Sequence, residues 1–123
     1  MYVRSSYPTL THVTITGNTA EELGGGMFVV SSNPALTHVT ITGNTADYTG
    51  GMYLNYSNPM LSHVTITNNT AEDGPGGGMY LYSSHPTLTH VTITDNTAGA
   101  SGGEESYNYC PPTQPTLPIL RIT

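Results

Sequence analysis

The sequence predicts an all-β fold, a parallel β-helix (β-solenoid) of about four rungs of 25–27 residues plus a degenerate fifth rung. The stretch HVTITGNTA occurs at His12–Ala20 and His38–Ala46 and returns with one change at His63–Ala71 and His90–Ala98. The prolines that precede these copies keep the same period: Pro8, Pro34, Pro59 and Pro86. No segment shows the apolar spacing of an amphipathic helix. A polar unit of this length without a helix is typical of a stacked β-rung.

Each repeat contains two segments with strand periodicity. In the first segment Val13 and Ile15 alternate with threonines, and in the second, which follows a glycine pair, Met27 and Val29 alternate with Phe28 and Val30. The residues expected to point inward are Leu10, Val13, Ile15, Ala20, Met27 and Val29, with their equivalents in later rungs. This small inward set explains how a chain with only 36% hydrophobic residues can form a core.

The two ends indicate how the repeats are divided. Residues 1–6 align with residues 27–32, so the chain is expected to start in mid-rung without an N-terminal cap. Residues 1–103 are predicted to form the solenoid, and residues 104–123 to form a degenerate rung or cap, with a disordered tail as the alternative. In this alignment Tyr107 takes the position of Tyr80, and Arg121 replaces a threonine. Pro118 and Arg121 are residues that blunt the edge of a sheet.

Composition excludes several function classes. The chain has two arginines, no lysine and a net charge of −6, which argues against nucleic acid or an anionic membrane as a partner. No apolar stretch approaches the ~20 residues of a membrane-spanning helix, so we expect no membrane insertion. Cys110 is the only cysteine, which excludes an internal disulfide.

The largest column of equivalent residues consists of threonines. A T-x-T pair occurs on each of four rungs: Thr14/Thr16, Thr40/Thr42, Thr65/Thr67 and Thr92/Thr94. Hydroxyls spaced ~7 Å along a strand and ~4.8 Å between rungs resemble the ice-binding face of β-solenoid antifreeze proteins. The alternative is that threonine suits any exposed strand position.

A second column is aromatic: Tyr2, Phe28, Tyr53, Tyr80 and Tyr107. If methionine and valine point inward on these strands, the rings point outward, where exposed aromatics can bind a glycan or form a protein interface. The alternative is a ladder that only stabilises the sheet through cross-strand pairs.

Two columns carry side chains that could bind a metal ion, although we expect the protein to need no cofactor. His12, His38, His63 and His90 could bind a transition metal or form a structural ladder at a corner, and the second interpretation is preferred. Glu21, Asp47 and Glu72 each follow the repeated alanine, and Ca²⁺ could neutralise such stacked carboxylates if they do not splay into solvent. A fifth column, Asn18, Asn44, Asn69 and Asn96, is expected to be structural, bonding one rung to the next and tolerating a left-handed backbone.

The repeat resembles the right-handed parallel β-helix repeats of polymorphic outer-membrane proteins and autotransporter passengers. Those repeats pair a GGA-[ILV] motif with F-x-x-N, and here Gly25-Gly26-Met27 and Ile15-Thr16-Gly17-Asn18 match it in outline. The later copies keep the glycine pair and the spacing to asparagine, up to about Gly103. Methionine replaces the small alanine and isoleucine replaces phenylalanine. The resemblance implies an adhesin or a surface stalk.

We therefore expect a non-enzymatic, extracellular or cell-surface structural protein. The near-identical rungs leave no singular cleft, and the two arginines lie at opposite ends of the chain, which argues against a polysaccharide lyase. It is expected to assemble head to tail with itself into a fibre or to form part of a surface adhesin, with a glycan or ice as the other possible partners. Ice binding through the threonines is the second hypothesis, and carbohydrate binding through the aromatic column is the third.

Overall fold

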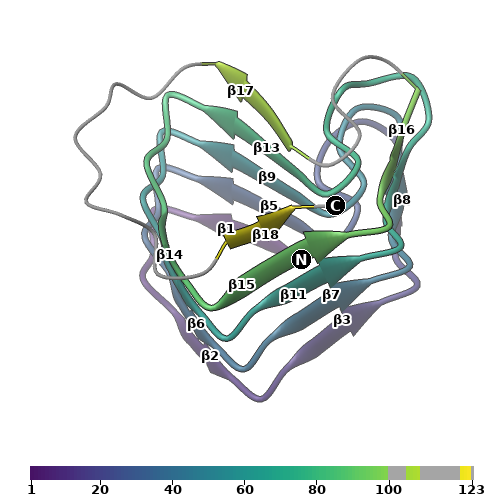
Figure 1. Cartoon of the computed structure of the whole chain (residues 1–123). Helices are drawn as coiled ribbons and strands as arrows, with labels where there is room; N and C mark the ends of the chain where they lie inside the picture. Colours follow the sequence, from purple (N-terminus) through teal and green to yellow (C-terminus); the bar gives the residue numbers. More distant parts are fainter. Residues whose placement is uncertain (100–104, 109–119, 123) are drawn as a thin grey trace.

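The computed structural model describes residues 1–99, 105–108 and 120–122, and these form a solenoid of stacked parallel rungs (Figure 1). Each of the first four rungs contributes a strand to each of four sheets, and the described residues of the fifth rung add a strand to two of them. The first sheet contains β1 (Tyr2–Arg4), β5 (Met27–Val30), β9 (Met52–Asn55), β13 (Met79–Tyr82) and β17 (Glu105–Asn108). The second contains β2 (Thr9–Thr11), β6 (Ala35–Thr37), β10 (Met60–Ser62) and β14 (Thr87–Thr89).

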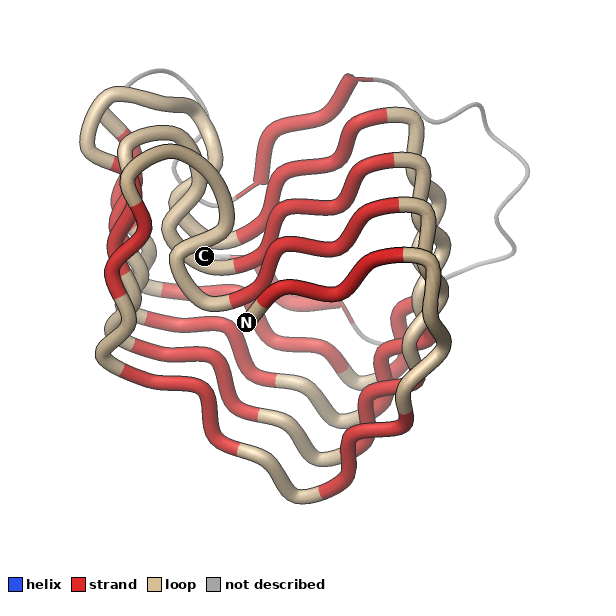
Figure 2. The backbone as a smooth tube through the Cα atoms, turned by 180° about the vertical axis from the view of Figure 1, so that it is seen from behind, coloured by secondary structure: helices blue, strands red, loops and turns tan. Residues whose placement is uncertain are grey.

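The third and fourth sheets complete each turn of the solenoid. Figure 2 shows the strands from behind. The third sheet contains β3 (Thr14–Thr16), β7 (Thr40–Thr42), β11 (Thr65–Thr67), β15 (Val91–Thr94) and β18 (Leu120–Ile122). The fourth contains β4 (Thr19–Ala20), β8 (Thr45–Ala46), β12 (Thr70–Ala71) and β16 (Thr97–Ala98). The described elements are all strands and their connections, which confirms the predicted all-β parallel solenoid of about four rungs.

The core lies inside the solenoid and consists of the residues that the alternation predicted. Met27, Val29, Leu36, Ile41 and their equivalents in later rungs are fully buried or nearly so. Leu10 and Val13, in the first rung, are only partly buried and pack against this cluster. The inward set is therefore confirmed.

A ladder of buried asparagines connects the rungs at the corner between the third and fourth sheets. The Asn69 Oδ1 accepts hydrogen bonds from the backbone N–H and the Nδ2 of Asn44 (3.0 and 2.9 Å). The Asn69 Nδ2 donates to the Asn96 Oδ1 (2.9 Å) and to the Ile41 carbonyl (3.0 Å). The structural role predicted for this column is confirmed, because each side chain bonds to the next rung.

The left-handed backbone expected at the asparagines lies one residue earlier. Positive φ occurs at Gly17, Gly43, Asn68 and Asp95, and the ladder asparagines are not among the positive-φ residues. The exposed preceding residue makes the sharp corner, and this places the asparagine side chain inside. The ladder asparagines therefore do not use the left-handed conformation that they were expected to tolerate.

A second ladder, of serines, was not predicted. The backbone N–H of Ser32 donates to the Ser57 Oγ (3.1 Å), and that of Ser57 donates to the Ser84 Oγ (3.0 Å). These serines follow the first sheet and are buried. Serine is common in exposed loops, so the sequence offered only its repetition before each Asn-Pro or His-Pro as a signal.

The last rung is partly as predicted. Arg121 lies opposite Thr92, as the alignment of the C-terminal segment indicated. In the first sheet, however, Tyr80 lies opposite Ser106, and Tyr107 lies opposite Leu81. The predicted position of Tyr107 in the aromatic column is wrong by one residue, because the second glutamate after the glycine pair, Glu105, pairs with Met79. Pro118 lies outside the described residues.

Candidate functional site

The threonine array forms one face of the solenoid. Thr14, Thr40, Thr65 and Thr92 lie in register on adjacent strands of the third sheet, as do Thr16, Thr42, Thr67 and Thr94. The isoleucines between them are buried, so the threonines face outward. Thr14 and Thr16 are exposed, and the later pairs are half-buried by their neighbours. The geometry is a regular two-column array of hydroxyls and methyl groups.

The aromatic column is stacked, but its centre is not exposed. The rings of Tyr53 and Tyr80 are stacked with centroids 5.3 Å apart, and both residues are only 8% exposed. Phe28 is half-buried, and Tyr2, at 59%, is the exposed member. The prediction of an exposed ladder is therefore wrong for Tyr53 and Tyr80, because the loops after the fourth sheet fold over this face.

Tyr48 is the residue that covers the column, and the sequence analysis missed it. Its ring lies 5.2 Å from that of Tyr80, edge to face, and 6.4 Å from that of Tyr53. Its hydroxyl and the Tyr80 hydroxyl are hydrogen-bonded to each other at 3.5 Å. This hydrogen bond, with burial and the neighbouring phenols, raises the pKa of Tyr80 to about 12. Tyr48 lies in a loop without repeat periodicity, so no sequence signal placed it over the ladder.

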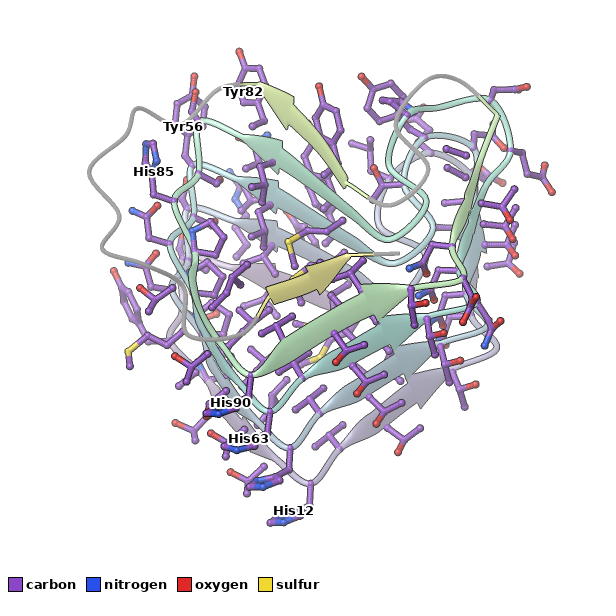
Figure 3. All side chains as sticks on the ribbon, in the orientation of Figure 1. His12, Tyr56, His63, Tyr82, His85 and His90 are labelled. Atoms are coloured by element: carbon purple, nitrogen blue, oxygen red, sulfur yellow. The ribbon has the colours of Figure 1, made fainter. Side chains whose placement is uncertain are left out.

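Two other tyrosines that the sequence analysis did not select lie together on the surface. Tyr56 follows β9 and Tyr82 ends β13, and their rings are edge to face with centroids 5.5 Å apart. Figure 3 shows both pointing away from the solenoid at one corner, with His85 near them. A hydrogen bond with Tyr56 is the largest of the causes that raise the pKa of Tyr82.

The histidine column lies along a different corner, where Figure 3 shows His12, His63 and His90 in a row. Successive rings are parallel within 10° and have centroids 4.7–4.8 Å apart. All four histidines are exposed and have φ of 53–55°. The nitrogens of parallel stacked rings point in the same direction rather than toward a common ion, which favours the structural interpretation over a metal site.

The acidic column likewise shows no assembled site. Glu21, Asp47 and Glu72 are exposed and follow β4, β8 and β12. Within the described residues, no group of three or more histidine, cysteine, aspartate or glutamate side chains is placed to hold a metal ion. Calcium binding at this column remains a prediction.

Comparison with known proteins identifies the family. The family model described as "right handed beta helix region" matches residues 1–109, which is most of the chain. Neither a curated protein nor a solved structure gives a significant match. Among the described residues, no helix is long and apolar enough to cross a membrane. The resemblance to autotransporter passengers receives no support from these comparisons.

Proposed function

The chain belongs to the right-handed β-helix family, and from this premise we propose that it is a non-enzymatic structural protein. In this proposal the solenoid acts outside the cell or at its surface, as a self-assembling fibre or as part of an adhesin. The observation that supports it is the uniformity of the rungs, because the asparagine, serine and histidine columns repeat the same contacts at every step. Such a rod resists bending and can be extended by any element that continues its ladders.

The absence of an enzyme function is part of the proposal. Catalysis in a β-helix requires a cluster of charged groups at one point of the rod. Arg4 lies on β1 and Arg121 on β18, which belong to different sheets. The acidic column is exposed, and within the described residues its side chains do not form part of a group that could hold a metal ion.

The fibre hypothesis predicts thin, unbranched filaments of the purified chain in negative-stain electron microscopy, and a mass above that of the monomer in light scattering. Thr40 donates its backbone N–H to the preceding rung, at the Val13 carbonyl (2.9 Å). The equivalent N–H of Thr14 therefore points away from the second rung, toward the outer edge of β3. Thr14→Pro removes this donor while leaving the bonds to the second rung intact, and we expect it to shorten or abolish filaments.

Thr14→Val is the matched control, because it keeps the N–H and should still assemble. A wild-type chain that stays monomeric at all concentrations would refute end-to-end assembly. Filaments that form equally well with Thr14→Pro would place the contact elsewhere than on the edge of β3.

Ice binding is a second candidate, supported by the in-register threonine array of the third sheet. We expect thermal hysteresis and ice shaping by the wild-type chain, and their loss in the double variant Thr40→Tyr/Thr65→Tyr, because bulky rings break the regular spacing of the array. Thr87→Tyr, at an exposed position on the second sheet, is the control and should retain activity. Hysteresis that survives the double variant, or is absent from the wild type, would contradict ice binding. Filament formation should be unaffected by these changes.

A further inference from the structure

Tyr56, Tyr82 and His85 form an exposed group that we call the aromatic corner. Tyr56 is 60% exposed and Tyr82 is 38% exposed. Their ring planes make an angle of 82°, so the two rings present an edge-to-face pair to solvent. Exposed tyrosines in contact with one another are uncommon on a solenoid whose other outward positions are mostly small and polar, and they are suited to hold a ligand.

The two rings are departures from the repeat. In the first, second and fourth rungs the position of Tyr56 is occupied by Ser5, Ser31 and Ser83, and all four residues have φ of 47–48°. A bulky side chain in this left-handed region is unfavourable, and such outliers cluster at functional sites. Tyr82 likewise lies opposite Asn55 in the neighbouring rung. Two aromatic substitutions therefore meet at one point where adjacent rungs have small polar residues.

Polar groups border the corner. The Asn58 Oδ1 accepts a hydrogen bond from the backbone N–H of His85 (2.7 Å), which holds the two turns in register. Asn58 and His85 are both exposed. The two turns that carry the rings thus also carry an exposed amide and an exposed imidazole group.

The charge of the corner restricts the ligand. The two segments that build it, Tyr53–His63 and Met79–His90, contain no aspartate, glutamate, lysine or arginine. A charged polymer would find no ion-pair partner in these segments, whereas a neutral ligand with both apolar faces and hydroxyl groups matches their chemistry. A pyranose has this character, because its C–H face packs on an aromatic ring and its hydroxyls bond to polar neighbours.

We propose that the aromatic corner is a binding site for neutral oligosaccharides. The site is independent of fibre assembly and of the threonine array, and it differs from the buried Tyr53–Tyr80 column. Tyr56 provides the main stacking surface, and its edge-to-face contact with Tyr82 fixes the orientation of the Tyr56 ring. The ligand lies across the corner, in contact with both rungs.

The test is isothermal titration calorimetry of the full chain with three neutral probes, cellohexaose, laminarihexaose and xylohexaose. We expect binding of at least one probe, and a loss of affinity of about fivefold or more in Tyr56→Ser and in Tyr82→Asn. Each variant introduces the residue that another rung already has at that position, so both are expected to fold. Tyr56→Phe keeps the ring and should retain most of the affinity.

Tyr2→Ala is the matched control, because Tyr2 is equally exposed but lies on β1, outside the corner. It should bind as the wild type does. Failure of all three probes to bind, or equal binding by Tyr56→Ser and the wild type, would overturn the proposal. A change in oligomeric mass in Tyr56→Ser without a change in probe binding would also overturn it, and would make the corner a contact between copies of the chain.

Discussion

Replacing Asn69 with alanine is expected to destabilise the solenoid by about 3–5 kcal/mol, a large part of the stability of a domain of this size. The Asn69 side chain makes hydrogen bonds with Asn44, Ile41 and Asn96, in the rungs on both sides. Alanine removes all of these bonds and leaves the backbone N–H of Asn44 and the carbonyl of Ile41 without these partners in the dry interior. A buried polar group that loses its partner costs about 1–3 kcal/mol. Urea denaturation followed by circular dichroism measures the change.

Asn68→Gly is the control for this prediction, since Asn68 precedes Asn69, is exposed and has φ of 54°. The first two rungs have Gly17 and Gly43 at this position, so glycine should be neutral or slightly stabilising. Equal unfolding midpoints for Asn69→Ala and Asn68→Gly would show that the buried ladder contributes little to stability.

The solenoid could be predicted from the sequence because each rung repeats the same periodicity. Alternation of Val13 and Ile15 with threonines defines which face of a strand is buried, and the repeat then defines the register between strands. A one-residue shift would turn the isoleucines toward solvent, so the buried set and the register specify each other. The inward position of the asparagines followed from the same repetition, although the residue that adopts the left-handed turn did not.

The parts that could not be predicted are those where the chain departs from its repeat. Tyr48 covers Tyr53 and Tyr80 from a loop, and no periodic pattern relates a loop residue to the face on which it folds. The strand periodicity correctly placed the aromatic column on the outer face. The prediction that this column is exposed was wrong for Tyr53 and Tyr80, because it did not include the covering loop. The register of the last rung was wrong at Tyr107 because the spacing after the glycine pair changes there.

The candidate sites differ in the same way, because one belongs to the repeat and the other interrupts it. The threonine array was predictable because it is part of the repeat, and its register is confirmed by the pairing of β3, β7, β11 and β15. The aromatic corner consists of residues that interrupt the repeat, at positions where Ser83 and Asn55 occupy adjacent rungs. In a repeat protein such interruptions are the places to search for a specific ligand, because the uniform columns are already explained by stability. Tyr56 was visible in the sequence as an aromatic residue at a serine position, but its contact with Tyr82 required the stacking of two rungs.

Gly51→Ala is expected to destabilise the solenoid strongly, although it adds only a single methyl group to the chain. An ideal Cβ at Gly51 would overlap the carbonyl oxygen of Gly78 in the next rung and lie 3.0 Å from the Ile66 Cγ2. Gly51 cannot move away, because its N–H bonds to the Gly77 carbonyl (3.0 Å) and its own carbonyl accepts from Met27 (2.9 Å). Relief of the overlap requires the rungs to separate, which breaks ladder bonds on both sides. We expect a loss of more than about 4 kcal/mol, or failure to fold, in thermal or urea denaturation.

Gly17→Asn distinguishes this close approach from the general effect of replacing a glycine. Gly17 has φ of +64°, but no atom lies within 4 Å of its ideal Cβ. The third rung already has an asparagine, Asn68, at this position, so Gly17→Asn should change stability by less than about 1 kcal/mol. The contrast follows from the spacing of the rungs: at Gly51 the neighbouring backbone is so close that only a hydrogen atom fits, whereas at Gly17 the corner faces solvent. A Gly51→Ala chain with wild-type stability would mean that the rungs are farther apart at the glycine pair than the hydrogen bonds from Gly51 to Gly77 and from Met27 to Gly51 allow.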